Sequence, residues 1–352
     1  MKKLLTLTML FTASILFAQE AEEKKFSVSG SVDAYYRANL NAPNDENAIA
    51  PGSSFANLPG FALGMANVVM SYEGEKVGFV ADLVFGPRGT DAIFGSPAVA
   101  PTSATLSTGN IVNQLYAYWN VSESVTLTMG NFNTFLGYEV ISPTANFNYS
   151  TSYLFSYGPF SHTGLKADIA LSEDFSLMLG VMNDTDATEF NATGDYAFGA
   201  QLGYSGQYLN VLIDPSFTEI DFTGGFDLSD DFYLGINAAY LKNEDVGSVD
   251  GGSFAGVALY PQLATSDAFT IGLRGEYFME ADGGSGAIGT YDTNGDASVF
   301  AVTLTGSLEI DNLTIKPELR LDSASEDGTF MDNDLMPSKS LGSFVLAAIY
   351  SF

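Results

Sequence analysis

Apolar and polar side chains alternate residue by residue in short stretches along this whole chain. Sixteen such stretches lie between residues 26 and 352, and most have the roughly ten residues that a strand needs to cross a membrane in a closed barrel. Their approximate ranges are 26–38, 63–73, 77–86, 110–121, 125–133, 162–171, 175–183, 195–205, 208–215, 218–228, 232–242, 253–264, 269–279, 297–310, 313–322 and 341–352. This pattern predicts an all-β fold, an antiparallel transmembrane β-barrel of about 16 strands over residues 26–352.

The connections between these stretches are of two alternating kinds. Minimal turns, rich in acidic, glycine and serine residues, join the second stretch to the third, the fourth to the fifth, and so on up to the fourteenth and fifteenth. The other connections are mostly long: 39–62, 87–109, 134–161, 184–194, 243–252, 280–296 and 323–340. Short periplasmic turns on one rim and long external loops on the other are typical of outer-membrane barrels. Ser216-Phe217 is short where a long connection is due, so 14 strands is an alternative count.

The two faces of each stretch differ in chemistry. In residues 313–322, one face carries leucine, isoleucine and proline, whereas the other carries threonine and four charged residues. The stretches 26–38 and 269–279 divide in the same way. One face therefore suits lipid and the other a hydrated lumen. Aromatic residues also gather beside the short turns, where the membrane interface would lie, although the core of a soluble β-sandwich is an alternative reading.

Both ends of the sequence indicate an exported protein. Lys2 and Lys3 precede an apolar run, which predicts a signal peptide over residues 1–18, with cleavage within 18–21, and a short periplasmic tail over 19–25. The apolar run is shorter than the roughly 20 residues that a helical span needs. The last stretch ends on Phe352 and resembles the closing strand of Gram-negative outer-membrane barrels, where this end is the signal to the barrel-assembly machinery. The expected location is the outer membrane, in contact with lipid and lipopolysaccharide.

Motifs within residues 110–183 carry a family resemblance. They include Gly130-Asn131-Phe132, Gly137-Tyr138-Glu139, the run 146–150, Gly158-Pro159-Phe160 and His162-Thr163-Gly164. These motifs resemble the putative β-barrel porin-2 family, the OmpL-like porins. The resemblance implies an outer-membrane channel, but it implies no particular solute and no catalytic residues.

Strand number bears on function through the diameter of the barrel. About eight strands fill their interior with side chains, whereas sixteen to eighteen leave an aqueous channel. We therefore expect a porin that gives passive diffusion of small hydrophilic solutes or ions. A plugged structural or adhesive barrel without transport is the alternative, and a soluble exported β-protein is a third reading. A homotrimer is expected by analogy with general porins, and strong acidity argues against nucleic acid as a partner.

The third long connection, residues 134–161, is rich in aromatic residues and has Glu139 as its only charge. We expect this loop to fold inward against the barrel wall and narrow the pore. The alternative is that it extends the fifth and sixth strands above the membrane.

Charged residues on inward faces are the candidates for the pore lining and its constriction. They are Asp33, Arg37, Glu139, Lys166, Arg274, Glu276, Lys316, Glu318 and Arg320, with Arg88 and Asp322 beside them. One hypothesis is a basic patch that faces Glu139 across a narrow opening and creates a transverse field. The other is a ladder of salt bridges that braces the wall. The net charge of −29, or −31 once Lys2 and Lys3 leave with the signal, favours cations.

Other chemistries find less support in the sequence. The only histidine, His162, is a candidate base for a hydrolase, but packing and hydrogen bonding in the loop is its simpler role, so no enzyme is expected. Asp292, Asn294 and Asp296 resemble part of a calcium loop, but the EF-hand order is not met and an acidic surface turn is the simpler reading. No cofactor and no metal site is therefore predicted.

Overall fold

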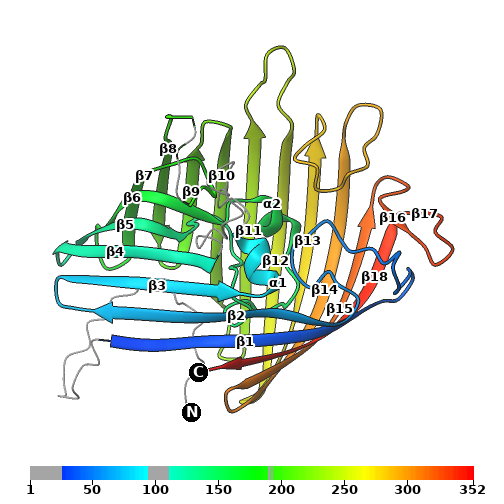
Figure 1. Ribbon diagram of the computed structural model, residues 1–352, viewed down its shortest axis with the longest axis horizontal. Helices are drawn as coiled ribbons and strands as arrows, with labels where there is room; N and C mark the ends of the chain where they lie inside the picture. Colours follow the sequence, from blue (N-terminus) through cyan, green and yellow to red (C-terminus); the bar gives the residue numbers. More distant parts are fainter. Residues whose placement is uncertain (1–25, 94–110, 189–190, 192) are drawn as a thin grey trace, which may run out of the picture.

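The structure is a computed structural model that describes residues 26–93, 111–188, 191 and 193–352. The expected signal peptide (1–18) and periplasmic tail (19–25) lie outside the described residues. The described chain forms a closed antiparallel barrel, in which β1 pairs with β18 and each other strand pairs with its neighbours in sequence (Figure 1). The sixteen barrel strands are β1 (Phe26–Asn39), β2 (Gly60–Glu73), β3 (Val77–Phe85), β4 (Val112–Ser122), β5 (Val125–Asn133), β6 (Ser161–Ala170), β7 (Phe175–Met182), β8 (Ala197–Tyr204), β9 (Gln207–Ile213), β10 (Phe217–Asp227), β11 (Phe232–Asn243), β12 (Ser253–Ser266), β13 (Phe269–Ala281), β14 (Ala297–Ile310), β15 (Leu313–Ala324) and β18 (Ser340–Ser351).

The count of sixteen strands is confirmed, and the alternative of fourteen is wrong. The short connection that raised the alternative joins β9 to β10, which pair as a tight hairpin with Ile213 opposite Thr218. Asp214 shapes this turn, because its backbone N–H donates to the Phe217 carbonyl at 2.9 Å and its carboxylate accepts the Ser216 N–H at 2.9 Å. A tight turn therefore serves on the rim where the other connections are mostly long.

The carboxy-terminal strand closes the barrel. Ser31 of β1 lies opposite Ser351 of β18, and Gly30 and Phe352 exchange two backbone hydrogen bonds of 3.0 Å. The terminal residue thus belongs to the seam between the first and last strands, where its backbone completes the ladder.

The alternation read from the sequence appears as two faces of the sheet. On β15, Leu319 and Leu321 point outward and are about half exposed, whereas Glu318 and Arg320 point inward and are buried. Because the apolar face looks out and the charged face looks in, the wall suits a lipid surround and a polar interior. Two short helices, α1 (Pro87–Ala92) and α2 (Tyr153–Tyr157), lie in the long connections, and neither has the length of a membrane span.

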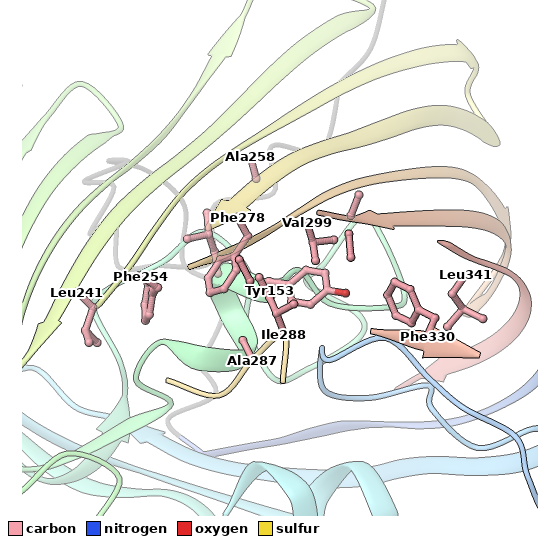
Figure 2. Close-up of a cluster of buried hydrophobic side chains, with 14 of the residues drawn as sticks. Tyr153, Leu241, Phe254, Ala258, Phe278, Ala287, Ile288, Val299, Phe330 and Leu341 are labelled. Atoms are coloured by element: carbon pink, nitrogen blue, oxygen red, sulfur yellow. The ribbon is translucent and has the colours of Figure 1, made fainter. Parts of the chain in front are cut away.

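Loops contribute a hydrophobic core inside the barrel. Tyr153 of α2 stacks on Phe278 of β13, with ring centroids 5.6 Å apart, and Figure 2 shows both rings among side chains from neighbouring strands. Ala287 and Ile288, from the connection between β13 and β14, join the same cluster. The last long connection adds a small hairpin, β16 (Phe330–Met331) with β17 (Pro337–Ser338). Much of this side of the lumen is therefore filled by loop residues.

Candidate functional site: the loop inside the barrel

The connection between β5 and β6, residues 134–160, is here called the inner loop because it follows the inner wall. Near its start, the Gly137 N–H donates to Asp221 of β10 at 3.0 Å, and the Tyr138 ring stacks on Tyr260 of β12 at 4.2 Å. Further along, the Asn148 side chain donates to Thr305 of β14 at 2.7 Å. The inner loop thus touches the wall from β10 round to β14, on the side of the barrel opposite its own strands.

Charged wall residues satisfy the backbone of the inner loop. Glu318 of β15 accepts the N–H groups of Tyr149 and Ser150 at 2.9 and 3.2 Å. Glu276 of β13 accepts the N–H groups of Tyr153 and Leu154 at 3.0 and 2.8 Å. A buried backbone without regular structure needs such partners, because each unpaired N–H or C=O group costs free energy.

Basic wall residues serve the carbonyl groups in the same way. Arg274 of β13 donates to the carbonyls of Ser150 and Thr151 at 2.6 and 3.1 Å, and Arg320 donates to the Thr151 carbonyl at 2.7 Å. Lys316 donates to the carbonyls of Pro143, at 3.1 Å, and of Asn146. Acids and bases on alternate inward positions of β13 and β15 therefore match the alternating N–H and C=O groups of the loop.

One ion pair joins the inner loop directly to the wall. Glu139 lies 2.7 Å from Arg274, and both side chains are almost fully buried. Glu139 also accepts the N–H of Ser152 at 2.7 Å, and Ser152 caps α2 by accepting the Phe155 N–H at 3.0 Å. The charge of the loop therefore fixes both its contact with β13 and the start of its helix.

Further contacts tie the loop to the first strands. The Tyr149 hydroxyl donates to Asp33 of β1. Arg88 of α1 donates to the carbonyls of Ile141 and Tyr149 at 2.9 and 3.2 Å, and its guanidinium lies 4.4 Å from the centre of the Phe55 ring. The inner loop is thus held at several points around the wall.

The comparisons with known proteins agree with this architecture. A family model described as putative beta-barrel porin-2, OmpL-like, matches residues 25–352. The chain belongs to this porin family. It is accordingly an outer-membrane β-barrel channel, and no curated protein matches its sequence.

Solved outer-membrane channels share the fold of this porin. The outer membrane channel DcaP of Acinetobacter baumannii superposes with a TM-score of 0.60 at 12% identity, over 93% of this chain and 97% of that one. An anion-selective porin from Comamonas acidovorans gives 0.59 at 11% identity, over 93% and 99%. A loop-deletion mutant of OmpT from Vibrio cholerae gives 0.54 at 10% identity, over 93% and 99%. At this identity, the likeness is one of fold.

The nine charged candidates of this porin fall into two groups. Eight are buried: Asp33, Arg37, Glu139, Arg274, Glu276, Lys316, Glu318 and Arg320. Of these, Arg37 donates to the Ile49 carbonyl of the first long connection at 3.2 Å, and the others contact the inner loop or belong to it. Since Glu139 touches Arg274, no open gap separates these two charges. That these buried charges exert a transverse electric field on a passing solute stays a prediction.

Lys166 of β6 forms the second group. Its side chain is 18% exposed and lies 2.7 Å from Asp168, whose side chain is 43% exposed. Among the described residues on inward faces, these are the mid-strand charges that remain accessible. Asp168 is not among the candidates predicted from the sequence, although it shares the inward face of its strand with Lys166, two positions away.

His162 and the acidic turn near Asp292 occupy structural positions. The His162 ring is buried, and its Nε2 lies 2.9 Å from the Thr134 hydroxyl at the start of the inner loop. The Asp292 carboxylate accepts the N–H groups of Asp296 and Asn294 at 3.0 and 2.8 Å, and these hydrogen bonds hold the pKa of Asp292 below its usual range. Within the described part of the chain, no group of three or more acidic or histidine side chains is placed to hold a metal ion.

Proposed function

We propose that this porin gives passive diffusion to small hydrophilic solutes and ions, and that the inner loop sets the width of the path. The observation that carries the proposal is the pairing of the loop backbone with Glu276, Glu318, Arg274 and Arg320. These hydrogen bonds between the loop and buried side chains of β13 and β15 support a position of residues 134–160 inside the barrel. Without the loop, sixteen strands would leave a wide aqueous channel.

A preference for cations belongs to the same proposal. The accessible mid-strand charges, Lys166 and Asp168, form a pair without net charge. At the short-turn rim, Glu73, Asp227 and Glu309 are exposed and fall on inward positions of their strands. A path lined by unbalanced acids raises the local concentration of cations, which supports cation preference.

The remaining parts of the proposal concern assembly and partners. We propose that the outward leucine and aromatic face contacts lipid and lipopolysaccharide, that Phe352 is read by the barrel-assembly machinery, and that the porin forms a homotrimer without catalytic activity. The position of Phe352 at the closing seam supports its role in assembly. Cross-linking in outer membranes tests the trimer, since a ladder that stops at the monomer would contradict it.

Deletion of residues 140–157 tests the role of the inner loop. We expect single-channel conductance to rise and larger neutral solutes to enter proteoliposomes faster, because the segment that lines the wall from β12 to β15 is removed. A matched control deletes residues 246–249, where Val246 and Val249 are exposed at the tip of the hairpin joining β11 to β12. Equal conductance in the two deletions and the full chain would refute the constriction.

A second candidate function draws on the filled interior. The cluster around Tyr153 and Phe278, together with the contacts of the inner loop, would suit a structural or adhesive barrel that is closed to solutes. A folded barrel that conducts only after residues 140–157 are deleted would favour this candidate over the porin proposal.

A further inference from the structure

Six aromatic rings lie partly exposed along the inner surface of the barrel. One of them, Tyr138, also helps to hold the inner loop on the wall by stacking on Tyr260. Three belong to the inner loop and three to strands β4, β9 and β11. They are Tyr118, Phe135, Tyr138, Phe147, Tyr208 and Tyr233. Each ring occupies the place where a neighbouring inward glycine would otherwise carry a side chain.

The contact with glycine brings each ring close against the wall. A Cβ added to Gly203 of β8 would lie 3.0 Å from the Tyr208 ring, and one added to Gly199 would lie 2.6 Å from Phe135. Gly78 of β3 is covered by Tyr118 in the same manner. Because one side of each ring covers backbone, the surface left exposed is directed into the lumen.

Neutral hydrogen-bonding groups lie between these rings. The Ser176 hydroxyl is beside Tyr208 above Gly203, and Thr126 and Gln262 are also partly exposed on inward positions. Apolar surfaces with a few placed polar groups are the general chemistry of small-molecule sites in proteins. A ligand for this surface therefore has apolar faces and polar edges.

Charge narrows the class of ligand. The accessible acids Glu73, Asp227 and Glu309 at the rim disfavour planar aromatic acids, which are anions. Neutral sugars fit the surface itself, because a pyranose ring presents C–H groups on its faces and hydroxyl groups at its edges. Building on the proposed porin function, we propose that these six rings, spaced along the inner wall from β4 to β13, bind neutral oligosaccharides in passage.

Current recordings with maltotriose as the probe test this inference. We expect concentration-dependent interruptions of the open-channel current, whereas a polyethylene glycol of the same hydrodynamic size lowers conductance without discrete interruptions. Tyr118→Ala and Tyr208→Ala should each shorten the interruptions about threefold to tenfold, the range expected for one lost ring contact. Tyr118→Phe and Tyr208→Phe keep the ring and should stay near the unmodified porin.

Tyr204→Ala is the matched control, because Tyr204 lies on β8 at the same rim as Tyr208 but faces lipid, where it packs on Phe175. Maltotriose that behaves like the polymer, or alanine variants that keep full interruption times, would overturn the inference. Calorimetry with maltotriose on the detergent-folded protein measures sugar binding without ion conduction. It therefore separates failure of the sugar site from failure of the porin proposal. A barrel that never conducts but loses maltotriose binding in Tyr208→Ala would refute transport and retain the sugar site, whereas no heat of binding would refute the site.

Discussion

Replacement of Arg274 by methionine should release the inner loop while the barrel stays closed. Arg274 is completely buried and reaches Glu139 at 2.7 Å, as well as the carbonyls of Ser150 and Thr151. Methionine fills similar volume but donates no hydrogen bond. The variant therefore leaves a buried carboxylate without its cation and two carbonyls without this donor.

The magnitude follows from the burial of the pair. Removal of one partner of a buried ion pair costs about 3–5 kcal/mol, because the remaining charge stays desolvated. The strand ladder does not depend on this contact, so the cost falls on docking of the inner loop. At about 1.4 kcal/mol for each factor of ten, loop opening should become at least about a hundredfold more frequent.

Hydrogen exchange of the detergent-folded porin measures this opening. Amides of residues 148–155 should exchange at least about a hundredfold faster in Arg274→Met, and the double variant with Glu139→Gln should recover part of the protection because both charges are gone. Asp168→Asn breaks the half-exposed pair with Lys166 and should leave these amides unchanged, since such pairs contribute at most about 1 kcal/mol. Unchanged protection in Arg274→Met would refute the anchoring role.

Further predictions concern selectivity, pH and assembly. Asp168→Asn should lower and Lys166→Gln should raise the cation preference read from the reversal potential, because these charges are accessible in mid-strand; shifts in the reverse directions would contradict this. Burial raises the pKa of Asp186 to about 6, above its unfolded value of 3.8. The folded protein therefore binds the proton of Asp186 more tightly than the unfolded chain does. Protonation of Asp186 favours the folded state fully below about pH 4, and this contribution is lost as pH rises through 6. Hydrogen exchange at Phe160, whose N–H donates to Asp186 at 2.8 Å, should show this trend after correction for intrinsic rates, and Asp186→Asn should abolish it. Phe352→Ala should lower the amount of porin in the outer membrane of cells but not the yield of detergent folding, because the backbone bonds of the seam remain; equal amounts in cells would contradict the assembly role.

Strand positions could be read closely from the sequence because the two faces of the wall meet different surroundings. The alternation predicts the fifteenth strand over 313–322, and it forms β15 at Leu313–Ala324. It predicts the second strand over 63–73, and this forms β2 at Gly60–Glu73. Differences concentrate at the long-loop ends, where strands rise beyond the lipid and the alternation of apolar residues is no longer required. The helices α1 and α2 and the hairpin β16–β17 lie in long connections, which carry no such period.

The partners of the inner loop could not be read in the same way. Aromatic composition and a single charge indicated that residues 134–161 avoid water, but the residue that pairs with Glu139 lies 135 positions away on β13. No periodic signal reports which strand lies across a barrel. Inward acids and bases on β13 and β15 looked like a pore lining because polar residues that face water and polar residues that face a loop backbone have the same pattern.

Single-channel conductance of the folded protein in a planar bilayer, across a salt gradient, measures directly whether the barrel passes ions and which ions it prefers. We expect stepwise openings and a reversal potential on the cation-selective side. A folded, heat-modifiable barrel that never conducts would contradict the porin proposal, and anion selectivity would contradict the part assigned to the accessible acids.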